Sequence, residues 1–405
     1  MNIKRDITDE IIKYINTDNI IVLHGARQVG KTHILNYVMD FLKEKKETIF
    51  FFDLEDSRLV DVLDAGVDSM LAFLEASGFN LENYKQSKKR LFVFIDEIQY
   101  LKNPSSLLKL LIDHHKYIQL IVSGSSSFEI KSKFSDSLAG RTVNFEIFNL
   151  SFEEFLRFKG KIYNLKKLDA YHLDEIKKLY EEFLLFGAYP KIVLENSIEK
   201  KEKYLLQIID TYIKKDIRDL AKIKNPEKFN ALLKVLAAQS GQLLRISELA
   251  KITGLSQPTI ENYLFILENT YIIKLLKPFS QNSRTEIIKL PKLFFYDTGI
   301  MQILWLNKIG SGMIGNIFET SIFTELAKKY GQDKLNYWRN KNKNEIDFIL
   351  RQGNEIVPME VKLNFNKFQK FSMALFCERY KVKKYKIVGL EGEKSGDDFA
   401  YPWEV

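Results

Sequence analysis

"IIVLHGARQVGKTHILNYVMDFLKE", residues 20–44, is the stretch that decides the fold of the first part of this chain. It begins with an apolar run, continues with the pattern G-x-x-x-x-G-K-T at residues 25–32, and ends in a helical pattern. A strand, a glycine-rich loop and a helix in this order bind phosphate, because the loop N–H groups and the positive end of the helix face the same anion. The stretch therefore predicts a nucleotide-binding α/β domain.

Each residue type in the loop has a physical role in that prediction. The glycines let the backbone wrap tightly around phosphate oxygens, Lys31 reaches the β- and γ-phosphates, and the Thr32 hydroxyl binds Mg²⁺. ATP and Mg²⁺ are the expected cofactors, and the loop residues expected to bind them are Gly25, Ala26, Arg27, Gln28, Val29, Gly30, Lys31 and Thr32. The alternative is a glycine-rich turn that carries a lysine facing solvent.

The sequence around this loop predicts a parallel sheet. Residues 19–150 alternate helical patterns with five short apolar runs: "NIIVLHG", "ETIFFFDL", "RLFVFIDE", "YIQLIVSGS" and "RTVNFEIF". Continuous apolar strands between helices are typical of a sheet that is covered on both faces. We therefore expect residues 1–150 to form a P-loop ATPase domain.

Polar residues follow several of these strands, where nucleotide chemistry would take place. Asp96 is expected to hold Mg²⁺ through water, and Glu97 to polarise the attacking water. Ser123 and Ser125 follow the next strand as candidate sensors of the γ-phosphate. Arg141 precedes the fifth strand and is a candidate arginine finger, acting within the chain or from a neighbouring subunit; a surface arginine is the alternative.

The rest of the chain divides into three predicted segments. Residues 151–227 are mostly helical, with a break at "FGAYP" (186–190), and form a lid or connector. Residues 228–311 show helices followed by two strands, which is typical of a winged helix-turn-helix. Residues 312–405 show a helix, three strands, a helix and a strand, so the overall fold class is α/β with a helical middle.

The helix-turn-helix prediction rests on caps, spacing and a wing. Ser247 and Ser256 are expected to cap the two helices, with Gly254 in the turn. The predicted apolar seam consists of Leu249, Ile252, Leu255, Ile260, Leu264 and Leu267. The second helix holds no Lys or Arg; the basic residues lie on the wing side, at Lys274, Lys277, Arg284, Lys289 and Lys292. This pattern leaves two interpretations open, contact with DNA and packing against protein.

The C-terminal segment contains "NEIDFILRQGNEIVPMEVK", residues 344–362. Alternation places Asp347 on one strand and Glu360 with Lys362 on the next, so two carboxylates and an ammonium can converge. Glu319 lies upstream on the apolar stripe of a helix, where an acid needs a partner or a metal. We expect Glu319, Asp347 and Glu360 to bind Mg²⁺ and Lys362 to position water. A salt-bridged hairpin is the alternative.

Charge and composition limit the partners. The net charge of +8 comes from −2 over residues 1–200, +6 over 201–300 and +4 over 301–405. A basic excess confined to one half favours an anionic partner such as DNA, with Arg339, Lys341 and Lys343 in a loop beside the carboxylates. Solvated basic faces are the alternative.

One cysteine and no long apolar run predict a cytoplasmic protein that does not enter a membrane.

These motifs together resemble known families. Glu319, Asp347, Glu360 and Lys362 resemble the PD-(D/E)xK nuclease pattern, especially that of archaeal Holliday-junction resolvases. The whole chain is similar to a prokaryotic family of AAA-type ATPases that carries "GARQVGKT", "FIDEIQ", "SGSSS…LAGR", "FGAYP", "KLFFYDTG" and "YWR…NEIDFIL…MEVK". The resemblance implies an ASCE-type ATPase with Lys31, Thr32, Asp96 and Glu97 in the usual roles.

Two functions are consistent with these patterns. The first is an ATP-hydrolysing protein that acts on DNA, as an ATP-coupled nuclease or a processor of branched DNA, and that can form a homo-oligomer. The second is a nucleotide-switched regulator that binds DNA or protein and whose nuclease-like domain is inactive.

Overall fold

The structure is a computed structural model, and it describes all residues except 1–2, 88, 125–137, 218–221, 281–289 and 311–314. The chain separates into two compact units, Met1–Phe148 and Asn149–Val405. This division falls two residues before the end of the predicted ATPase domain. Across the described residues, no helix is both long and apolar enough to cross a membrane.

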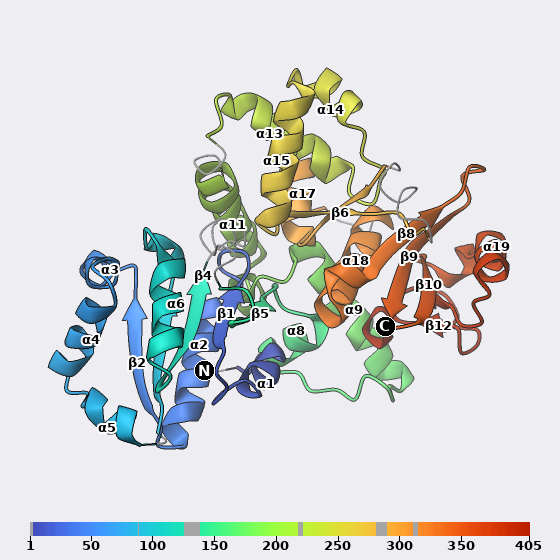
Figure 1. The fold of residues 1–405 in the computed structure, drawn as a ribbon. Helices are drawn as coiled ribbons and strands as arrows, with labels where there is room; N and C mark the ends of the chain where they lie inside the picture. Colours follow the sequence, from blue (N-terminus) through green and yellow to red (C-terminus); the bar gives the residue numbers. More distant parts are fainter. Residues whose placement is uncertain (1–2, 88, 125–137, 218–221, 281–289, 311–314) are drawn as a thin grey trace. The chain divides into compact units, whose positions relative to one another are not determined.

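The first unit is built on a five-stranded sheet in which every neighbouring pair is parallel, in the order β2-β3-β4-β1-β5. Figure 1 shows the sheet with helices around it. The five strands coincide with the five apolar runs of the sequence: β1 (Ile20–His24), β2 (Thr48–Asp53), β3 (Leu91–Asp96), β4 (Ile118–Gly124) and β5 (Thr142–Glu146). The predicted α/β P-loop fold is therefore confirmed.

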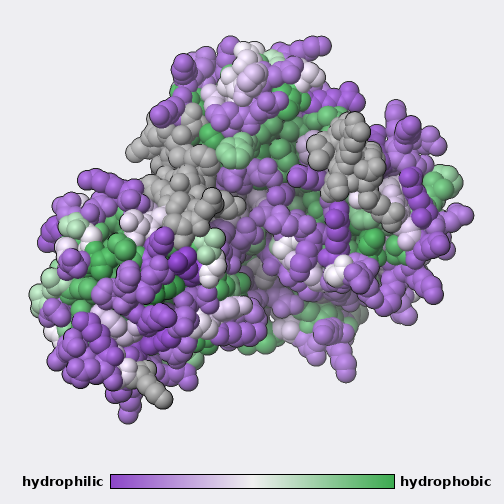
Figure 2. Space-filling view, in the orientation of Figure 1, coloured by the Kyte–Doolittle hydropathy of each residue, from purple (hydrophilic) through white to green (hydrophobic). Residues whose placement is uncertain are grey.

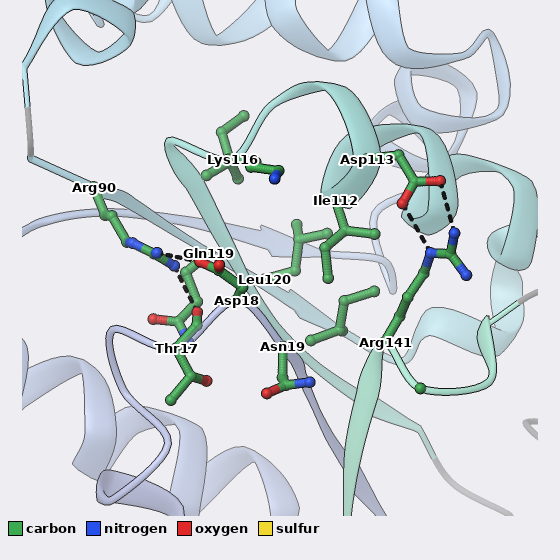
Figure 3. Close-up of a pocket in the computed structure, with 13 residues that line it drawn as sticks. Thr17, Asp18, Asn19, Arg90, Ile112, Asp113, Lys116, Gln119, Leu120 and Arg141 are labelled. Carbon is green, nitrogen blue, oxygen red and sulfur yellow. Dashed lines mark hydrogen bonds and ion pairs between the residues drawn. The ribbon is translucent and has the colours of Figure 1, made fainter.

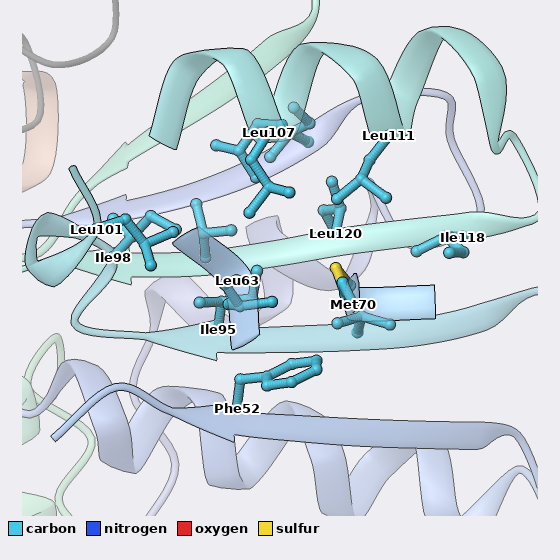
Figure 4. Close-up of a cluster of buried hydrophobic side chains, with 14 of the residues drawn as sticks. Phe52, Leu63, Met70, Ile95, Ile98, Leu101, Leu107, Leu111, Ile118 and Leu120 are labelled. Atoms are coloured by element: carbon cyan, nitrogen blue, oxygen red, sulfur yellow. The ribbon is translucent and has the colours of Figure 1, made fainter. Parts of the chain in front are cut away.

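Helices cover both faces of this sheet. They are α1 (Ile7–Ile12), α2 (Lys31–Glu44), α3 (Ser57–Asp64), α4 (Val67–Ala76), α5 (Leu81–Gln86), the short η1 (Ile98–Tyr100) and α6 (Pro104–His114). Figure 4 shows the core on one face, where Leu107 and Leu111 of α6 point toward Ile95 and Leu120 of the strands. This packing fixes the strands, so the edge at which they end is a rigid support for a site.

The second unit begins with helices α8 (Phe152–Phe158), α9 (Ala170–Phe186), α10 (Pro190–Leu194) and α11 (Ile198–Ile208), followed by the π-helical η3 (Ile209–Asp216). The predicted break at "FGAYP" separates α9 from α10. Gly187 has φ +73 there, and a side chain at this position would collide with the buried carboxylate of Asp297. Asp297 accepts hydrogen bonds from the backbone N–H groups of Ala188 and Ile300, each at 2.9 Å. The Asp297 carboxylate of "KLFFYDTG" is therefore hydrogen-bonded to the backbone of "FGAYP".

The middle of this unit holds α13 (Pro226–Ala238), α14 (Ile246–Thr253), α15 (Gln257–Asn269), the antiparallel strands β6 (Ile273–Leu276) and β7 (Lys292–Phe295), and α17 (Thr298–Leu306). The predicted helix, turn, helix and strand order is present. Ser256 caps α15 as expected, but Ser247 lies inside α14, whose N-cap is Arg245. Ile252 is 55% exposed, so it does not belong to the apolar seam.

The C-terminal part forms a second five-stranded sheet, in the order β12-β11-β10-β9-β8. Its elements are α18 (Gly315–Tyr330), the short η4 (Gln332–Lys334), β8 (Leu335–Arg339), β9 (Glu345–Gln352), β10 (Glu355–Val361), the short η5 (Phe365–Lys367), α19 (Lys370–Tyr380), β11 (Lys386–Val388), β12 (Phe399–Ala400) and the short η6 (Pro402–Glu404). β8, β9 and β10 are antiparallel, whereas β11 joins β10 in parallel. Gly353, with φ +59, lies in the tight turn between β9 and β10 that the sequence predicts.

The chain after β6 continues into this C-terminal sheet. The N–H of Phe279 donates to the carbonyl of Tyr337 in β8 at 2.5 Å. The Phe279 ring lies in the same hydrophobic cluster as Trp338 and Phe376. The predicted winged-helix segment and the C-terminal segment are therefore packed into one another rather than joined by a free linker.

Candidate functional site

The glycine-rich loop lies between β1 and α2, at the edge where the strands β1, β3 and β4 end. Gly30 has φ +98 and Gln28 has φ +63, so the loop needs the left-handed conformations that glycine adopts easily. A side chain at position 25 would collide with the backbone carbonyl of Ile147. Both glycines of the pattern are therefore required by the geometry of the loop, as its sequence predicts.

Lys31 is buried at the start of α2, and its ammonium lies inside the loop. Nζ donates to the carbonyls of Gly25 at 3.1 Å and Ala26 at 2.8 Å. Burial lowers the pKa of Lys31 to about 8, although the carboxylates of Glu97 and Asp96 act in the opposite direction. Two neutral carbonyls compensate this charge only in part, which makes the position receptive to an anion such as a phosphate.

Asp96 joins three elements at the end of β3. Its Oδ2 accepts a 2.6 Å hydrogen bond from the hydroxyl of Thr32 in α2. Its Oδ1 accepts from the hydroxyl of Ser123 in β4 and from the N–H of Glu97 at 3.1 Å. The structure therefore brings Thr32, Asp96 and Ser123 together beside Lys31, as the sequence predicts; Ser125 lies outside the described residues. A hydroxyl and a carboxylate at this position suit Mg²⁺, a cation that prefers oxygen ligands and keeps several waters.

Glu97 follows Asp96 in the left-handed conformation, with φ +55. Its Oε2 accepts a hydrogen bond from the side-chain amide of Gln99 in η1. Asp53 and Glu55, at the end of the neighbouring strand β2, are exposed. Gln99 was not predicted from the sequence, and it fixes where the Glu97 carboxylate lies.

Arg5 is a second residue that the sequence patterns do not single out. Its buried guanidinium donates to the carbonyl of Val29 at 2.8 Å and to that of Phe148 at 2.9 Å. A planar fork with several donors can hold two carbonyls at once. Arg5 therefore supports the glycine-rich loop from the side of the N-terminal segment, and no local motif marks this role.

Arg141 lies at the opposite edge of the sheet from the loop. It immediately precedes β5, whose first residue Thr142 is paired with Ile20, the first residue of β1. Its guanidinium binds Asp113 of α6 at 2.8 and 3.1 Å and lines a cavity of about 190 Å³ with Asn19. Figure 3 shows this cavity and the ion pair. In this structure Arg141 therefore does not reach the nucleotide site of its own chain. A finger for a neighbouring subunit and a surface arginine are the two interpretations that remain.

The second unit contains the predicted carboxylate site at the end of the β9–β10 pair. Lys362 binds Glu360 at 2.6 Å and lies 3.9 Å from Asp347. The Asp347 carboxylate also accepts a hydrogen bond of 2.8 Å from the N–H of Val361. Glu319 of α18 is close enough to Asp347 for their charges to interact. The four residues predicted from the sequence thus lie together.

Three further charged residues, Lys292, Glu345 and Arg339, complete this site. Lys292 of β7 lies 3.0 Å from Glu319, 2.5 Å from Glu345 and 3.5 Å from Asp347. Glu345 in turn binds Arg339 at 3.1 Å. Lys292 was one of the wing-side basic residues considered for contact with DNA, but it is only 2% exposed and packs within the protein. A lysine two positions before Phe294 in an apolar strand shares its face, and this signal was present in the sequence.

The charges of this cluster nearly cancel. Four carboxylates face three cations, which leaves a net charge of −1 when all are ionised; they are Glu319, Glu345, Asp347, Glu360, Lys292, Arg339 and Lys362. Burial raises the pKa of Glu319 to about 7, and burial together with the nearby Asp347 carboxylate raises that of Glu360 to about 7. Burial alone would lower the pKa of Lys292, but its three acidic partners outweigh this and raise it.

The predicted Mg²⁺ site does not fit this arrangement. Within the described residues, no three or more His, Cys, Asp or Glu side chains are grouped so that they could hold a metal ion. The ammonium of Lys292 lies between Glu319 and Asp347, where a cation would be bound. The chain's own lysine therefore occupies the cation position between these carboxylates.

The structure describes some of the basic residues that were considered for contact with DNA. Lys277, Lys341 and Lys343 are exposed, whereas Arg284 and Lys289 lie outside the described residues. Lys274 is bound to Glu268 at 3.1 Å. On the exposed side of α15 lie Gln257, Pro258, Glu261, Asn262 and Phe265. The face drawn in Figure 2 is mainly hydrophilic, with hydrophobic patches near α14 and α15.

Comparison with protein families divides the chain into three matches. Residues 17–156 match the model of an AAA domain. Residues 177–311 match a domain of unknown function (DUF8612), and residues 314–401 match another (DUF4143). The first match, the parallel sheet and the glycine-rich loop support a P-loop domain of AAA type, with nucleotide binding as its expected property.

Relatives extend over most of the chain. An uncharacterized protein of Methanocaldococcus jannaschii is 28% identical over 89% of this chain and 78% of its own length. An uncharacterized protein of Haemophilus influenzae is 26% identical over 88% and 86%. Among solved structures, AMPPCP-bound DnaA from Aquifex aeolicus is 18% identical with a TM-score of 0.29, over 65% of this chain and 86% of its own. Cdc6p from Pyrobaculum aerophilum is 14% identical with a TM-score of 0.31, over 75% and 93%.

Proposed function

We propose that this protein binds and hydrolyses ATP with Mg²⁺ at the loop between β1 and α2. The observation that supports this most is the cluster of Thr32, Asp96 and Ser123 beside the buried ammonium of Lys31. Bound Mg²⁺ would neutralise phosphate charge, with Thr32 and Asp96 as its protein partners. Lys31 would exchange its two loop carbonyls for phosphate oxygens.

Glu97 would act as the base that orients the attacking water. It lies next to Asp96 at the end of β3, and Gln99 holds its carboxylate. A nucleophilic water must approach the γ-phosphate opposite the leaving group, so the base has to be fixed in place. Arg141 would serve the site of a neighbouring copy, because it lies at the far edge of its own sheet.

We further propose that the second unit contacts DNA through its exposed lysines. The basic excess of the chain lies after residue 200, and Lys277, Lys341 and Lys343 are exposed. The winged-helix interpretation of α14, α15 and β6–β7 is less favourable for base contacts, because the exposed side of α15 carries no Lys or Arg. Nonspecific phosphate contact by the basic loops is the form of binding that these residues suit best.

DNA cleavage is not proposed for this conformation. The sequence pattern of a PD-(D/E)xK nuclease is complete, and the order of helix and strands from α18 to β11 agrees with it. However, Lys292 fills the cation position between Glu319 and Asp347. This observation favours the alternative in which a nucleotide-switched protein binds its partner with an inactive nuclease-like domain.

Two experiments test these proposals separately. Lys31→Ala should abolish binding of Mg-ATP, measured by calorimetry, and retained affinity would refute the nucleotide site. The double variant Lys341→Glu, Lys343→Glu should weaken DNA binding at low salt, measured by fluorescence anisotropy. The exposed pair Lys166→Glu, Lys167→Glu changes the net charge equally and serves as the control. Equal loss in both variants would contradict a specific role for the loop at residues 339–343.

A further inference from the structure

Lys292 is the first residue of β7, and its side chain is bound inside the second unit. Its ammonium contacts acidic groups of two different elements, Glu319 in α18 and Glu345 with Asp347 in β9. A lysine side chain is flexible and normally extends to water. Here 3% of the side chain is exposed, so the charge depends on these carboxylates.

The strand β7 holds this lysine in place. Lys292 and Phe294 lie on one face of the strand, because side chains alternate along it. The Phe294 ring stacks on Phe323 of α18 with ring centres 4.8 Å apart, and it also contacts Phe348 of β9. The same two elements that supply the carboxylates thus bind the neighbouring aromatic residue. The packing of Phe294 therefore holds the backbone of β7 at the distance from which Lys292 reaches the carboxylates.

The backbone next to Lys292 is also hydrogen-bonded to the loop that precedes α14. The carbonyl of Leu293 accepts a hydrogen bond of 2.7 Å from the N–H of Gly241. Gly241 has φ +83, and a side chain there would contact the Glu319 carboxylate. The loop before α14 is therefore shaped to let β7 approach α18 closely.

An ammonium and a divalent cation exclude one another at this position. A divalent ion needs carboxylate oxygens at about 2.0–2.6 Å. Lys292 already occupies the space within 3.0 Å of Glu319 and 3.5 Å of Asp347. A second cation beside it would meet strong repulsion in a site that is largely shielded from water. The two cations therefore compete for the same carboxylates.

We propose that Lys292 is the resident cation of the carboxylate site, so that Glu319, Glu345 and Asp347 serve to fasten β7 to the C-terminal sheet and do not bind a divalent metal. The sequence keeps the residues of the nuclease pattern, but their carboxylates form ion pairs inside the protein. This proposal concerns metal binding in the second unit, and it holds or fails independently of ATP hydrolysis.

Binding of Mn²⁺ without nucleotide tests the proposal, with the free ion followed by electron paramagnetic resonance. The wild-type chain should bind no more Mn²⁺ than its Asp347→Asn variant. Lys292→Met removes the charge but keeps the apolar stem. This variant should bind Mn²⁺ at least tenfold more tightly than the wild-type chain does. The double variant Lys292→Met, Asp347→Asn should lose this gain. Lys274→Met is the matched control, because Lys274 is also an ion-paired lysine of the strand pair, bound to Glu268.

Several results would overturn the proposal. One is a site in the wild-type chain that disappears in Asp347→Asn. Another is a folded Lys292→Met variant that gains no Mn²⁺, or an equal gain in Lys274→Met. If Lys292→Met does not fold, the comparison of the wild-type chain with Asp347→Asn still decides whether metal binds these carboxylates. Circular dichroism identifies that case.

Discussion

The hydroxyl of Thr32 donates a 2.6 Å hydrogen bond to Oδ2 of Asp96, although 64 residues separate them in the sequence. Thr32 belongs to the first turn of α2, and Asp96 is the last residue of β3. The strand order β3-β4-β1 brings the ends of these elements to one edge of the sheet. The fold therefore assembles an oxygen-rich site from two motifs that are distant in the chain.

Replacement of Thr32 tests the value of this hydroxyl. Thr32→Ala removes a hydrogen bond to a charged group, worth about 1.5–3 kcal/mol, and the hydroxyl that we propose as a ligand of Mg²⁺. We expect affinity for Mg-ATP to fall by roughly tenfold or more. Thr32→Ser keeps the hydroxyl and should remain close to the wild-type chain. Calorimetric titration measures both, and equal affinity in the alanine variant would contradict the role of Thr32.

The binding of ATP should depend on pH through Lys31. Burial lowers the pKa of Lys31 in the free protein to about 8, and phosphate oxygens would favour its charged form. Below pH 8 the ammonium is already charged, so affinity should be nearly constant. Above pH 8 binding must take up a proton, and affinity should fall by up to about tenfold per pH unit.

Proton uptake gives a direct reading of this effect. Titrations at pH 8.5 in buffers of different ionisation enthalpy measure the number of protons taken up on binding. Lys31→Arg keeps its charge at every accessible pH and should show no uptake. A wild-type affinity that does not change between pH 7 and 9.5 would disagree with a Lys31 contact to phosphate.

Arg141 should act on a neighbouring subunit if it is a finger. Arg141→Ala should then reduce ATP turnover by about 10³-fold or more. Mixing it with Lys31→Ala, which keeps the arginine but lacks a working loop, should restore part of the activity. Arg58→Ala serves as control, since Arg58 is an exposed arginine paired with Asp56. No loss in Arg141→Ala, or no recovery on mixing, would leave Arg141 as a surface arginine.

The stability of the second unit should fall as pH rises from about 4.5 to 7. Burial raises the pKa values of Glu319 and Glu360 to about 7 in the folded chain, whereas their ordinary value is 4.5. The folded state therefore binds more protons in this window, so the stabilisation is complete below 4.5 and is lost as pH rises through 7. Lys292 and Lys362, the cations that face these acids, oppose this trend.

Calorimetry can isolate this contribution. Glu319→Gln resembles the protonated acid, so its melting temperature relative to the wild-type chain should increase between pH 5 and 7.5. The exposed Glu393→Gln changes a surface carboxylate and should show no such trend. A constant difference between Glu319→Gln and the wild-type chain would contradict the raised pKa.

Local sequence patterns predict most of the fold. Continuous apolar runs identify all five strands of the first sheet, and the glycine, lysine and threonine spacing identifies the loop between β1 and α2. Alternation also places Asp347, Glu360 and Lys362 correctly, because a tight turn joins β9 to β10. In these cases the residues that must meet lie on elements whose arrangement follows from short-range periodicity.

Contacts between distant elements were not predictable in the same way. Alternation along β7 places Lys292 on the same face as Phe294, but the burial of that face follows from the packing of β7 on α18 and β9. Arg5 supports the loop from an N-terminal segment that has no motif. Ile252 fits the helical seam by spacing but is exposed. The contacts of such residues depend on which elements pack against one another. Local patterns in a single sequence do not specify this packing.

Turnover of ATP by Glu97→Gln is the measurement that tests the central claim most directly. Glutamine keeps the size and one acceptor of Glu97 but cannot act as a base, and such groups contribute about 10²–10⁴-fold to rate. We predict ATP affinity close to that of the wild-type chain and turnover at least about 100-fold lower. Glu55→Gln, an exposed acid after the neighbouring strand, should retain full turnover. Unchanged turnover in Glu97→Gln would contradict the hydrolytic site proposed here.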